Sequence, residues 1–510
     1  MSLDDKRLIR RDWLYWTFVA SLAVSFSLWL IPIGSPLWLD EAISFCQIHL
    51  GRSQITSQPR LTFPAYSYIL WFLSRFLGTS EIALRIPSVL AMLGAVYLLY
   101  RATLALFDST VALISVILFC LNPIVVFAAI DARPYAFGAL AINASIYVLV
   151  CLRESNSIRL AVGLGIFSAM MLWFHFLFGV MVPALLAGFV VVKLGVTTDS
   201  SPEIRRLRRK VMWRQLTAAI SGFILFFLPI IPGLLYMFRT KGDHPFDRAP
   251  ELGDLIFTIA PGWTLPMLAV TAFLGLIIAG LRTEKSRTPG AKVGLWRILL
   301  SQILALVPLL ILYIVSISTS LHIFVMRYRL VGSAGICICW ALLVSGFKPR
   351  VLQAVFCLGM VAITTVLYLR SPAAHQHGYT WKYAIEVAEK NTATQHSPVL
   401  ICSDLPEADH WPMPTGDAVK DSNLFAPLSY YKLSAPVVAL PRSLNPAAMT
   451  IGSNFIQAEA ARHERFLAMA YIPSYPTLQW LIKAASATHN AHQLGEYDGV
   501  SVVEFTPRAN

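Results

Sequence analysis

Apolar residues recur along the first 370 positions in runs long enough to cross a bilayer, separated by short polar or basic segments. A transmembrane helix needs about 20 mostly apolar residues. This pattern predicts eleven membrane spans, at roughly 13–33, 85–106, 110–130, 134–152, 158–174, 176–194, 215–238, 263–281, 298–320, 329–346 and 351–369.

One further apolar run, residues 66–77, is short for a span and typical of an interfacial helix. Its assignment decides which side every later loop faces. If it lies in the interface, the basic loops at 195–214 and 282–297, with Arg101, Arg153, Arg159, Lys348 and Arg350, join the N-terminus in the cytoplasm. The positive-inside rule favours that arrangement, so we expect a cytoplasmic N-terminus and an outer C-terminus.

Composition supports a polytopic membrane protein. Of 510 residues, 56% are hydrophobic and 14% charged, with a mean hydropathy of +0.62, which excludes an ordinary soluble globular protein. The net charge of +13 is explained by basic loops and requires no nucleic acid partner. The seven cysteines show no metal-ligand spacing; Cys46 and Cys402 lie outside the spans, and their pairing stays open.

The composition changes near Arg370, where we expect a membrane domain (1–369) to give way to a soluble extracytoplasmic α/β domain (370–510). The predicted elements are helices near Trp381–Asn391, Ile456–Met469 and Pro476–Thr488, a buried strand at Pro398–Cys402 and two strands at 493–506, with an irregular stretch at 404–446. That stretch is long for a loop, so it contains further structure or covers a site.

The first outer loop (34–84) brings two adjacent carboxylates, Asp40 and Glu41, to the edge of the membrane. Charge at that depth is costly unless it faces water, a partner or a ligand, which makes the pair a candidate functional site. The structural alternative is that Asp40 only caps a helix that runs to about Leu50.

Three more groups of polar residues fall on the same predicted face: Asp131-Ala-Arg-Pro-Tyr135, Met326-Arg-Tyr-Arg329 and His175 between two aromatic residues. Each has a structural explanation, namely a local ion pair, snorkelling arginines and a helix-end histidine. Together they combine carboxylates for general base catalysis with arginines that bind phosphate. The combination suits a lipid-phosphate substrate that meets a hydroxyl acceptor.

Several motifs, in order, resemble the GT-C fold glycosyltransferases, in the branch that holds protein O-mannosyltransferases, the aminoarabinose transferase of lipid A and rhizobial galacturonosyltransferases. They are Asp40-Glu41, a degraded motif at Thr62-Phe-Pro-Ala-Tyr-Ser67, Phe76–Ser88, Ala132-Arg-Pro-Tyr-Ala136 and the aromatic-His-aromatic at 174–176. The resemblance covers roughly residues 13–350, and the Trp381 helix with Tyr430-Tyr431 is similar to the outer domain of the rhizobial members.

The resemblance implies an inverting transfer of a sugar from a polyprenyl-phosphate donor to a hydroxyl acceptor, which is a lipid, glycan or protein, at the outer face of the cell membrane. Asp40 would be the general base and Glu41 would orient it or bind sugar. Arg133, with Arg327 and Arg329 as weaker candidates, would neutralise the departing phosphate, and Tyr66, Asp131, Tyr135 and His175 would contact substrate.

The chain departs from the family where relatives carry His or Lys and this sequence has Thr62; Arg60, two residues earlier, is our hypothesis for a substitute. Some family members use a divalent cation, to which Asp40 and Asp131 would contribute. The spacing of the carboxylates does not establish a metal here, and no other cofactor is expected.

Two alternatives remain open. A lipid-linked glycan flippase would need ionisable or broken helices near mid-membrane, whereas the acids here collect at one face. A glycan polymerase or ligase of related architecture would use a diphosphate-linked donor and chiefly arginines.

Overall fold

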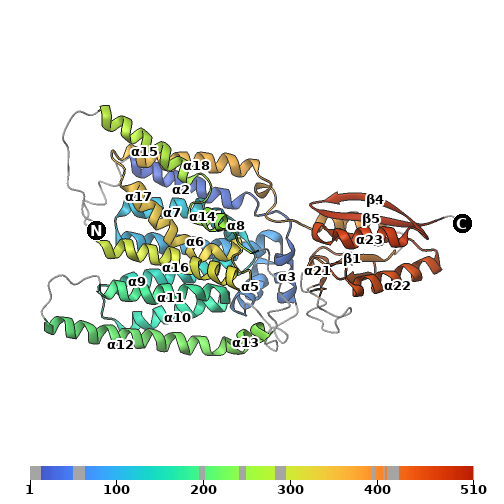
Figure 1. Ribbon diagram of the computed structural model, residues 1–510, viewed down its shortest axis with the longest axis horizontal. Coiled ribbons are helices and arrows are strands. Elements are labelled where there is room, and N and C mark those ends of the chain that lie inside the picture. The colour runs from blue at the N-terminus through green and yellow to red at the C-terminus, as the bar shows by residue number, and fades with distance from the viewer. Residues whose placement is uncertain are drawn as a thin grey trace.

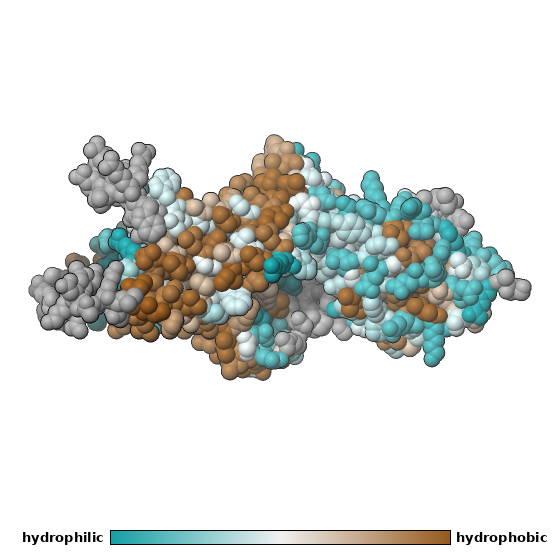
Figure 2. Space-filling model, turned by 90° about the horizontal axis from the view of Figure 1, so that it is seen from above, coloured by the Kyte–Doolittle hydropathy of each residue, from teal (hydrophilic) through white to brown (hydrophobic). Residues whose placement is uncertain are grey.

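The computed structural model describes residues 13–49, 64–194, 202–239, 249–281, 294–392, 397–405, 408–409 and 424–508. A bundle of helices occupies one part of the molecule, and an α/β sheet lies beyond one end of the bundle (Figure 1). The surface of the bundle is largely hydrophobic, whereas that of the α/β part is largely hydrophilic (Figure 2). This division is the one expected of a membrane-embedded bundle that carries a water-exposed sheet.

Within the described residues, six helical segments are long and apolar enough to cross a membrane. They are α6 (Glu81–Leu106), η1 with α11 (Phe176–Val180, Met181–Leu194), Arg206–Leu235, α16 (Leu295–Ser318), η4 with α17 (Met326–Gly332, Ser333–Ser345) and α18 (Val351–Arg370). The segment Arg206–Leu235 comprises most of α12 (Pro202–Phe227), η2 (Leu228–Ile230) and part of α13 (Ile231–Arg239).

Two bent pairs and three shorter apolar helices complete the bundle. The pairs are α7 with α8 (Ser109–Leu121, Pro123–Ile130) and α14 with α15 (Leu252–Ile259, Thr264–Leu281), and the shorter helices are α2 (Trp13–Leu30), α9 (Tyr135–Cys151) and α10 (Ile158–Phe174). Each predicted apolar segment coincides with one of these elements. The number of crossings and their orientation stay predictions.

Some predicted boundaries are wrong. The run 110–130 is two helices that meet at 68°, because Pro123 has no N–H to continue α7 and Asn122 caps α8 by accepting the amide of Ile124 at 3.0 Å. The predicted loop 195–214 becomes helical from Pro202 onwards, since α12 extends its apolar stretch with a basic first half. Helix α14 lies between the predicted spans 215–238 and 263–281.

The predicted loop 34–84 contains two helices, as expected: α3 (Leu39–His49) and α5 (Pro64–Leu77). Helix α5 exposes Phe72, Phe76 and Leu77, in agreement with an amphipathic helix of interfacial type. It is not among the candidate spans in the described part of the chain.

The C-terminal part forms a five-stranded sheet in the order β2-β1-β3-β5-β4. The strands are β1 (Val399–Cys402), β2 (Val437–Leu440), β3 (Phe466–Tyr471), β4 (His489–Tyr497) and β5 (Val500–Pro507). Strands β2, β1 and β3 are parallel, with Val399 opposite Val437 and Leu467, while β5 is antiparallel to both β3 and β4. Apolar residues of α22 (Pro446–Arg462) and α23 (Tyr475–Ala485) pack on one face of the sheet, and those of α19 (Lys382–Thr392) pack on the other.

The helix predicted at Ile456–Met469 is wrong in its second half. Helix α22 ends at Arg462, the next residue His463 has a left-handed φ of 52°, and Phe466-Leu-Ala-Met-Ala-Tyr471 continues as buried β3. Such a short apolar run has no periodicity that separates a buried strand from a buried helix. The stretch expected to be irregular also holds α21 (Ala426–Tyr430), β2 and the start of α22.

The sheet contacts the bundle through α3. Leu39, Ala42 and Cys46 pack against apolar residues that follow β1 and flank α21, and α21 lies beside α3 in Figure 1. Cys46 and Cys402 are both buried and both free, so the structure shows no disulfide between them.

A buried ion pair joins α6 to the chain around α3. Arg85 donates from Nε and Nη2 to the two carboxylate oxygens of Glu41, at 2.8 and 2.5 Å, and both side chains are fully buried. Its remaining N–H groups donate to the carbonyl oxygens of Pro32, Ile33, Ser35 and Pro36. One side chain therefore fixes the turn between α2 and α3.

Replacing Arg85 by methionine is expected to lower the free energy of unfolding by about 3–5 kcal/mol, because Glu41 would remain as an uncompensated buried charge. The measurement is unfolding of the purified protein in detergent. Arg101→Met is the matched control, since Arg101 is exposed on the same helix and should cost less than about 1 kcal/mol. Equal losses in the two variants would contradict the assignment.

Candidate functional site

The site is built around Asp40, in the first turn of α3. Its Oδ2 lies 3.7 Å from Nη1 of Arg327, at the start of η4, and 4.0 Å from Nη2 of Arg133, in the turn between α8 and α9. The Asp40 side chain is 18% exposed and that of Arg327 is 29% exposed. The structure thus brings together one accessible carboxylate and two guanidinium groups from three separate segments.

Arg133 is held more tightly than Arg327. Its Nη1 donates to the backbone oxygen of Asp40 at 3.3 Å and to Oγ of Ser44 at 3.4 Å. Burial is the largest influence and lowers the pKa of the Arg133 guanidinium, but Asp40, Tyr135 and Asp131 together outweigh it and raise the pKa above its ordinary value. Arg133 is therefore a fixed positive charge beside Asp40.

Glu41 is adjacent to Asp40 in sequence but faces a different environment. Besides the bonds from Arg85, its oxygens accept the backbone N–H of Ala132 at 2.9 Å and of Trp38 at 3.3 Å. Burial by itself raises the pKa of Glu41, but the charge and hydrogen bonds of Arg85 hold it below the ordinary value. The carboxylate is an ionised anchor whose oxygens are occupied by donors from the protein itself.

Asp131 lies at the end of α8, fully buried. Its Oδ1 accepts the indole N–H of Trp38 at 3.0 Å and lies 3.4 Å from Nε2 of His377, while its backbone oxygen accepts the Ser88 hydroxyl at 2.6 Å. Burial raises the pKa of Asp131, against the lowering effect of His377. These contacts hold the start of the turn that carries Arg133.

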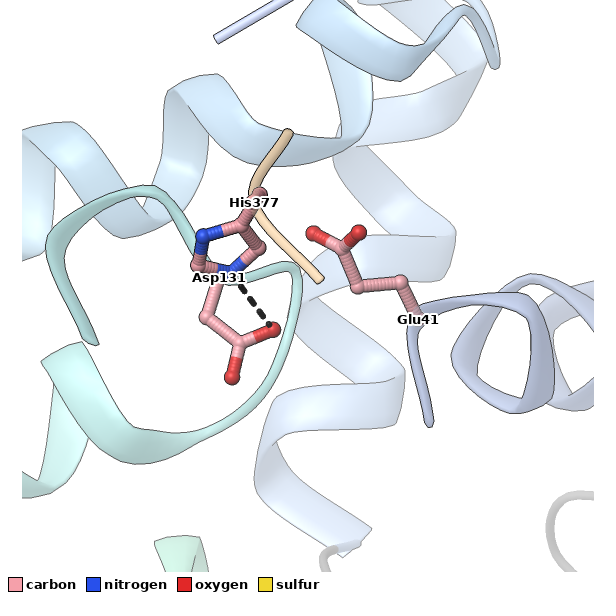
Figure 3. A group of neighbouring side chains, drawn as sticks. All are labelled: Glu41, Asp131 and His377. Atoms are coloured by element: carbon pink, nitrogen blue, oxygen red, sulfur yellow. Dashed lines mark ion pairs between the residues drawn. The ribbon is translucent and has the colours of Figure 1, made fainter. Parts of the chain in front are cut away.

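Glu41, Asp131 and His377 form a group whose potential metal-ligand atoms lie within 4.8 Å of one another (Figure 3). The donor set fits a cation only in part. Asp131 Oδ2 has no hydrogen-bond partner in the described part of the chain, and with His377 Nε2 it offers two ligand atoms. The third candidate, Glu41, is committed to Arg85, whose positive charge would oppose a cation. The expected ligand Asp40 is not a member of the group.

Four aromatic or imidazole side chains among the predicted substrate contacts and their neighbours are buried. Tyr135 and His175 pack with Tyr328, with ring centroids 5.7 Å apart for Tyr135–His175 and 4.7 Å for His175–Tyr328. Tyr66 on α5 packs against Phe137, at 5.7 Å. Arg327 lies over the ring of Tyr328, 5.4 Å from its centroid, so the cluster of Tyr135, His175 and Tyr328 lies beside this arginine.

Two further arginines, Arg329 and Arg60, were predicted to bind the donor phosphate. Arg329 lies with α14: its Nη2 is 3.8 Å from Asp254 and its Nη1 donates to Thr258 at 3.2 Å, so the structure does not bring it to Asp40. Arg60 lies outside the described residues.

Three contributors escaped the sequence analysis: Arg85, Trp38 and His377. Arg85 and Trp38 stand within segments noted there, but nothing local marks them as partners of Glu41 and Asp131. His377 follows the last apolar segment, 342 residues beyond the Ser35 side chain that accepts its amide. The only signal for Arg85 in the sequence is that it is a charged residue at the edge of a predicted span, where a charge requires a partner.

Comparison with known proteins finds a family model that matches part of the chain. A family model described as dolichyl-phosphate-mannose-protein mannosyltransferase matches residues 57–231. No curated protein matches the sequence.

The fold is shared with solved membrane glycosyltransferases. ArnT from Cupriavidus metallidurans in the apo state is 13% identical, with a TM-score of 0.53 over 95% of this chain and 97% of that one. The same protein bound to undecaprenyl phosphate is 12% identical, with a TM-score of 0.50 over 96% and 98%. The arabinofuranosyltransferase AftD from Mycobacteria is 14% identical, with a TM-score of 0.51 over 98% of this chain and 40% of that one. These likenesses show that the chain has the fold of these membrane glycosyltransferases, and the family model matches part of the same region.

Proposed function

We propose that this protein is an inverting glycosyltransferase that moves a sugar from a polyprenyl-phosphate donor to a hydroxyl acceptor at the outer face of the cell membrane. The observation that carries the proposal is the grouping of Asp40 with Arg133 and Arg327, at 4.0 and 3.7 Å. It combines a general base and a phosphate site at the end of the bundle that meets the C-terminal sheet (Figure 1).

The charge balance of this group supports the donor class. Glu41 and Arg85 neutralise each other inside the protein, so Asp40 with the two arginines leaves one net positive charge. A polyprenyl-phosphate sugar is a phosphodiester with one negative charge, and its phosphate gains a second charge as the sugar departs. Guanidinium groups fixed where charge develops stabilise the transition state more than the ground state.

In the proposed reaction Asp40 takes the proton of the acceptor hydroxyl while that oxygen attacks the anomeric carbon. The new C–O bond forms as the bond from this carbon to the phosphate oxygen breaks on the opposite face, which inverts the anomeric configuration. The phosphate leaves with the lipid, next to Arg133 and Arg327. Asp40 suits the role of base because it is the more accessible of the two adjacent carboxylates.

We assign positioning roles to the other predicted contacts. Glu41 and Asp131 are fully buried and hold the turn before α9, and Tyr66, Tyr135 and His175 form the floor of the site. Arg329, which lies with Asp254, is left out of the phosphate site.

Basic residues at the opposite end of the bundle support an outer location for the site. Helices α6, α9 and η4–α17 begin near the site, so Arg101, Arg153 and Lys348 lie near their far ends. The Arg206–Arg214 stretch and Arg297 lie at the starts of α12 and α16, which run back toward the site end. By the positive-inside rule that far end faces the cytoplasm, and the C-terminal sheet is extracytoplasmic.

The printed ligands of two solved neighbours support a lipid-phosphate donor. ArnT was solved with undecaprenyl phosphate, and the archaeal oligosaccharyltransferase AglB, with a TM-score of 0.50 and 12% identity, with a dolichol-phosphate and an inhibitory peptide. The acceptor of this protein is proposed only as a hydroxyl of a lipid, glycan or protein.

Asp40→Asn is expected to lower transfer by about 10²- to 10⁴-fold, because the amide cannot accept the acceptor proton. The assay incubates purified protein with a panel of polyprenyl-phosphate sugars and a crude acceptor extract, and detects the free lipid phosphate by mass spectrometry. Asp254→Asn is the control, as Asp254 also lies beside an arginine but away from Asp40. Full activity of Asp40→Asn would rule out this residue as the base.

Arg327→Gln and Arg329→Gln form a second matched pair, two residues apart on η4. Loss of Arg327 should slow release of lipid phosphate by about 10²- to 10³-fold, since a charge that stabilises the leaving phosphate is removed. Loss of Arg329 should chiefly lower thermal stability, because it ties η4 to α14. An equal effect of both substitutions on the rate would contradict a phosphate site at Arg327.

A further inference from the structure

The linker between α18 and α19 lies against the segment that leads into α3. We call residues 376–380 the strap. Gln376 Nε2 donates to the carbonyl of Pro36 at 3.2 Å, the amide of His377 donates to Ser35 Oγ at 3.1 Å, and the Thr380 hydroxyl donates to the carbonyl of Leu37 at 3.1 Å. The strap therefore lies along residues 35–37, just before Trp38, Asp40 and Glu41.

Glycine at position 378 makes this close approach feasible. A Cβ there would lie 2.8 Å from Cγ and 2.9 Å from Cβ of Trp38, atoms near the backbone that cannot swing aside. Trp38 is itself held by Asp131, to which it donates its indole N–H.

The side chain of His377 extends from the strap toward α8 and Asp131. Its ring stacks on Phe127 of α8, with centroids 4.5 Å apart and planes at 26°, and it is buried. Its Nε2 lies 3.4 Å from Oδ1 of Asp131 (Figure 3), just beyond the usual length of a hydrogen bond. The structure shows this contact at ion-pair distance and not as a hydrogen bond. Hydrogen bonds at catalytic sites are often long without substrate and shorten in the substrate complex.

We propose that His377 is a positioning residue of the transferase site, which acts through Asp131 on Arg133. The proposal rests on the function proposed above. The indole N–H of Trp38 donates to Asp131 Oδ1, and Nε2 of His377 approaches the same oxygen. The next two residues, Ala132 and Arg133, carry the effect onward. The amide of Ala132 is bonded to Glu41, and Arg133 reaches Asp40.

This role differs from metal binding. The charged groups that face His377 are Asp131 and Glu41, and Glu41 is neutralised by Arg85. A neutral imidazole with its proton on Nε2 is sufficient to donate to Asp131, so the role requires neither a cation nor protonation of His377. It makes the linker to the C-terminal sheet part of the site and not a tether alone.

The test separates the donor from the stacked ring. His377→Phe keeps an aromatic ring against Phe127 and removes the donor, whereas His377→Gln places an N–H near the position of Nε2. With the polyprenyl-phosphate sugar that the wild-type protein consumes, we expect His377→Phe to lower kcat on the order of 10²-fold with KM within a few-fold, and His377→Gln to recover most of the loss. His375→Phe is the control, because His375 is exposed two residues earlier in the same linker.

A second readout is independent of activity. Hydrogen–deuterium exchange of the full-length protein should become faster at the amides of Ala132 and Arg133 in His377→Phe, and not in His377→Gln or His375→Phe. Slow exchange retained in His377→Phe would overturn the proposal, as would equal loss of kcat in the Phe and Gln variants. A divalent metal ion that the wild-type protein needs for transfer and that restores transfer in His377→Gln would also overturn it, because His377 would then act as a metal ligand. If no donor is consumed by the wild type, the proposed function fails while the exchange measurement still decides the role of His377.

Discussion

The buried pair of Arg85 and Glu41 is the interaction on which the site depends. Two charges removed from water are tolerated only when their remaining hydrogen-bonding capacity is satisfied. Here the guanidinium binds both carboxylate oxygens and the open carbonyls after α2, and the carboxylate accepts two backbone amides. Satisfying these two charges brings together the end of α2, the start of α3, the first turns of α6 and the turn before α9.

This arrangement gives adjacent carboxylates opposite roles. Glu41 faces inward, and its carboxylate is occupied by the buried ion pair with Arg85. Asp40, one position earlier on the helix, faces Arg133 and Arg327 and keeps access to solvent. A helix rotates its side chains by about 100° per residue, so neighbours in sequence meet different surroundings. The buried anchor fixes the orientation of α3, and the orientation of α3 places Asp40.

Sequence reasoning located the accessible half of the site better than the buried half. Asp40, Arg133 and Arg327 were predicted to gather at one membrane face because topology and charge placement are readable from hydropathy. Arg329 was predicted with them and lies with Asp254 instead, since two residues along a tight helical turn can face different neighbours. The roles of His377 and Arg85 were missed because their partners are distant in the chain, and no local sequence pattern indicates a long-range contact.

The sequence by itself determined which segments are apolar helices, where the α/β part begins and which polar residues stand at the ends of helices. These properties follow from local composition, because the cost of placing polar groups in hydrocarbon applies residue by residue. Only the tertiary structure decided that the run 110–130 bends by 68°, that 466–471 is a strand and that Glu41 is a buried anchor beside a partly exposed Asp40. Each of these depends on which distant group fills a backbone gap, completes a sheet or neutralises a charge, and that pairing is set by packing in three dimensions.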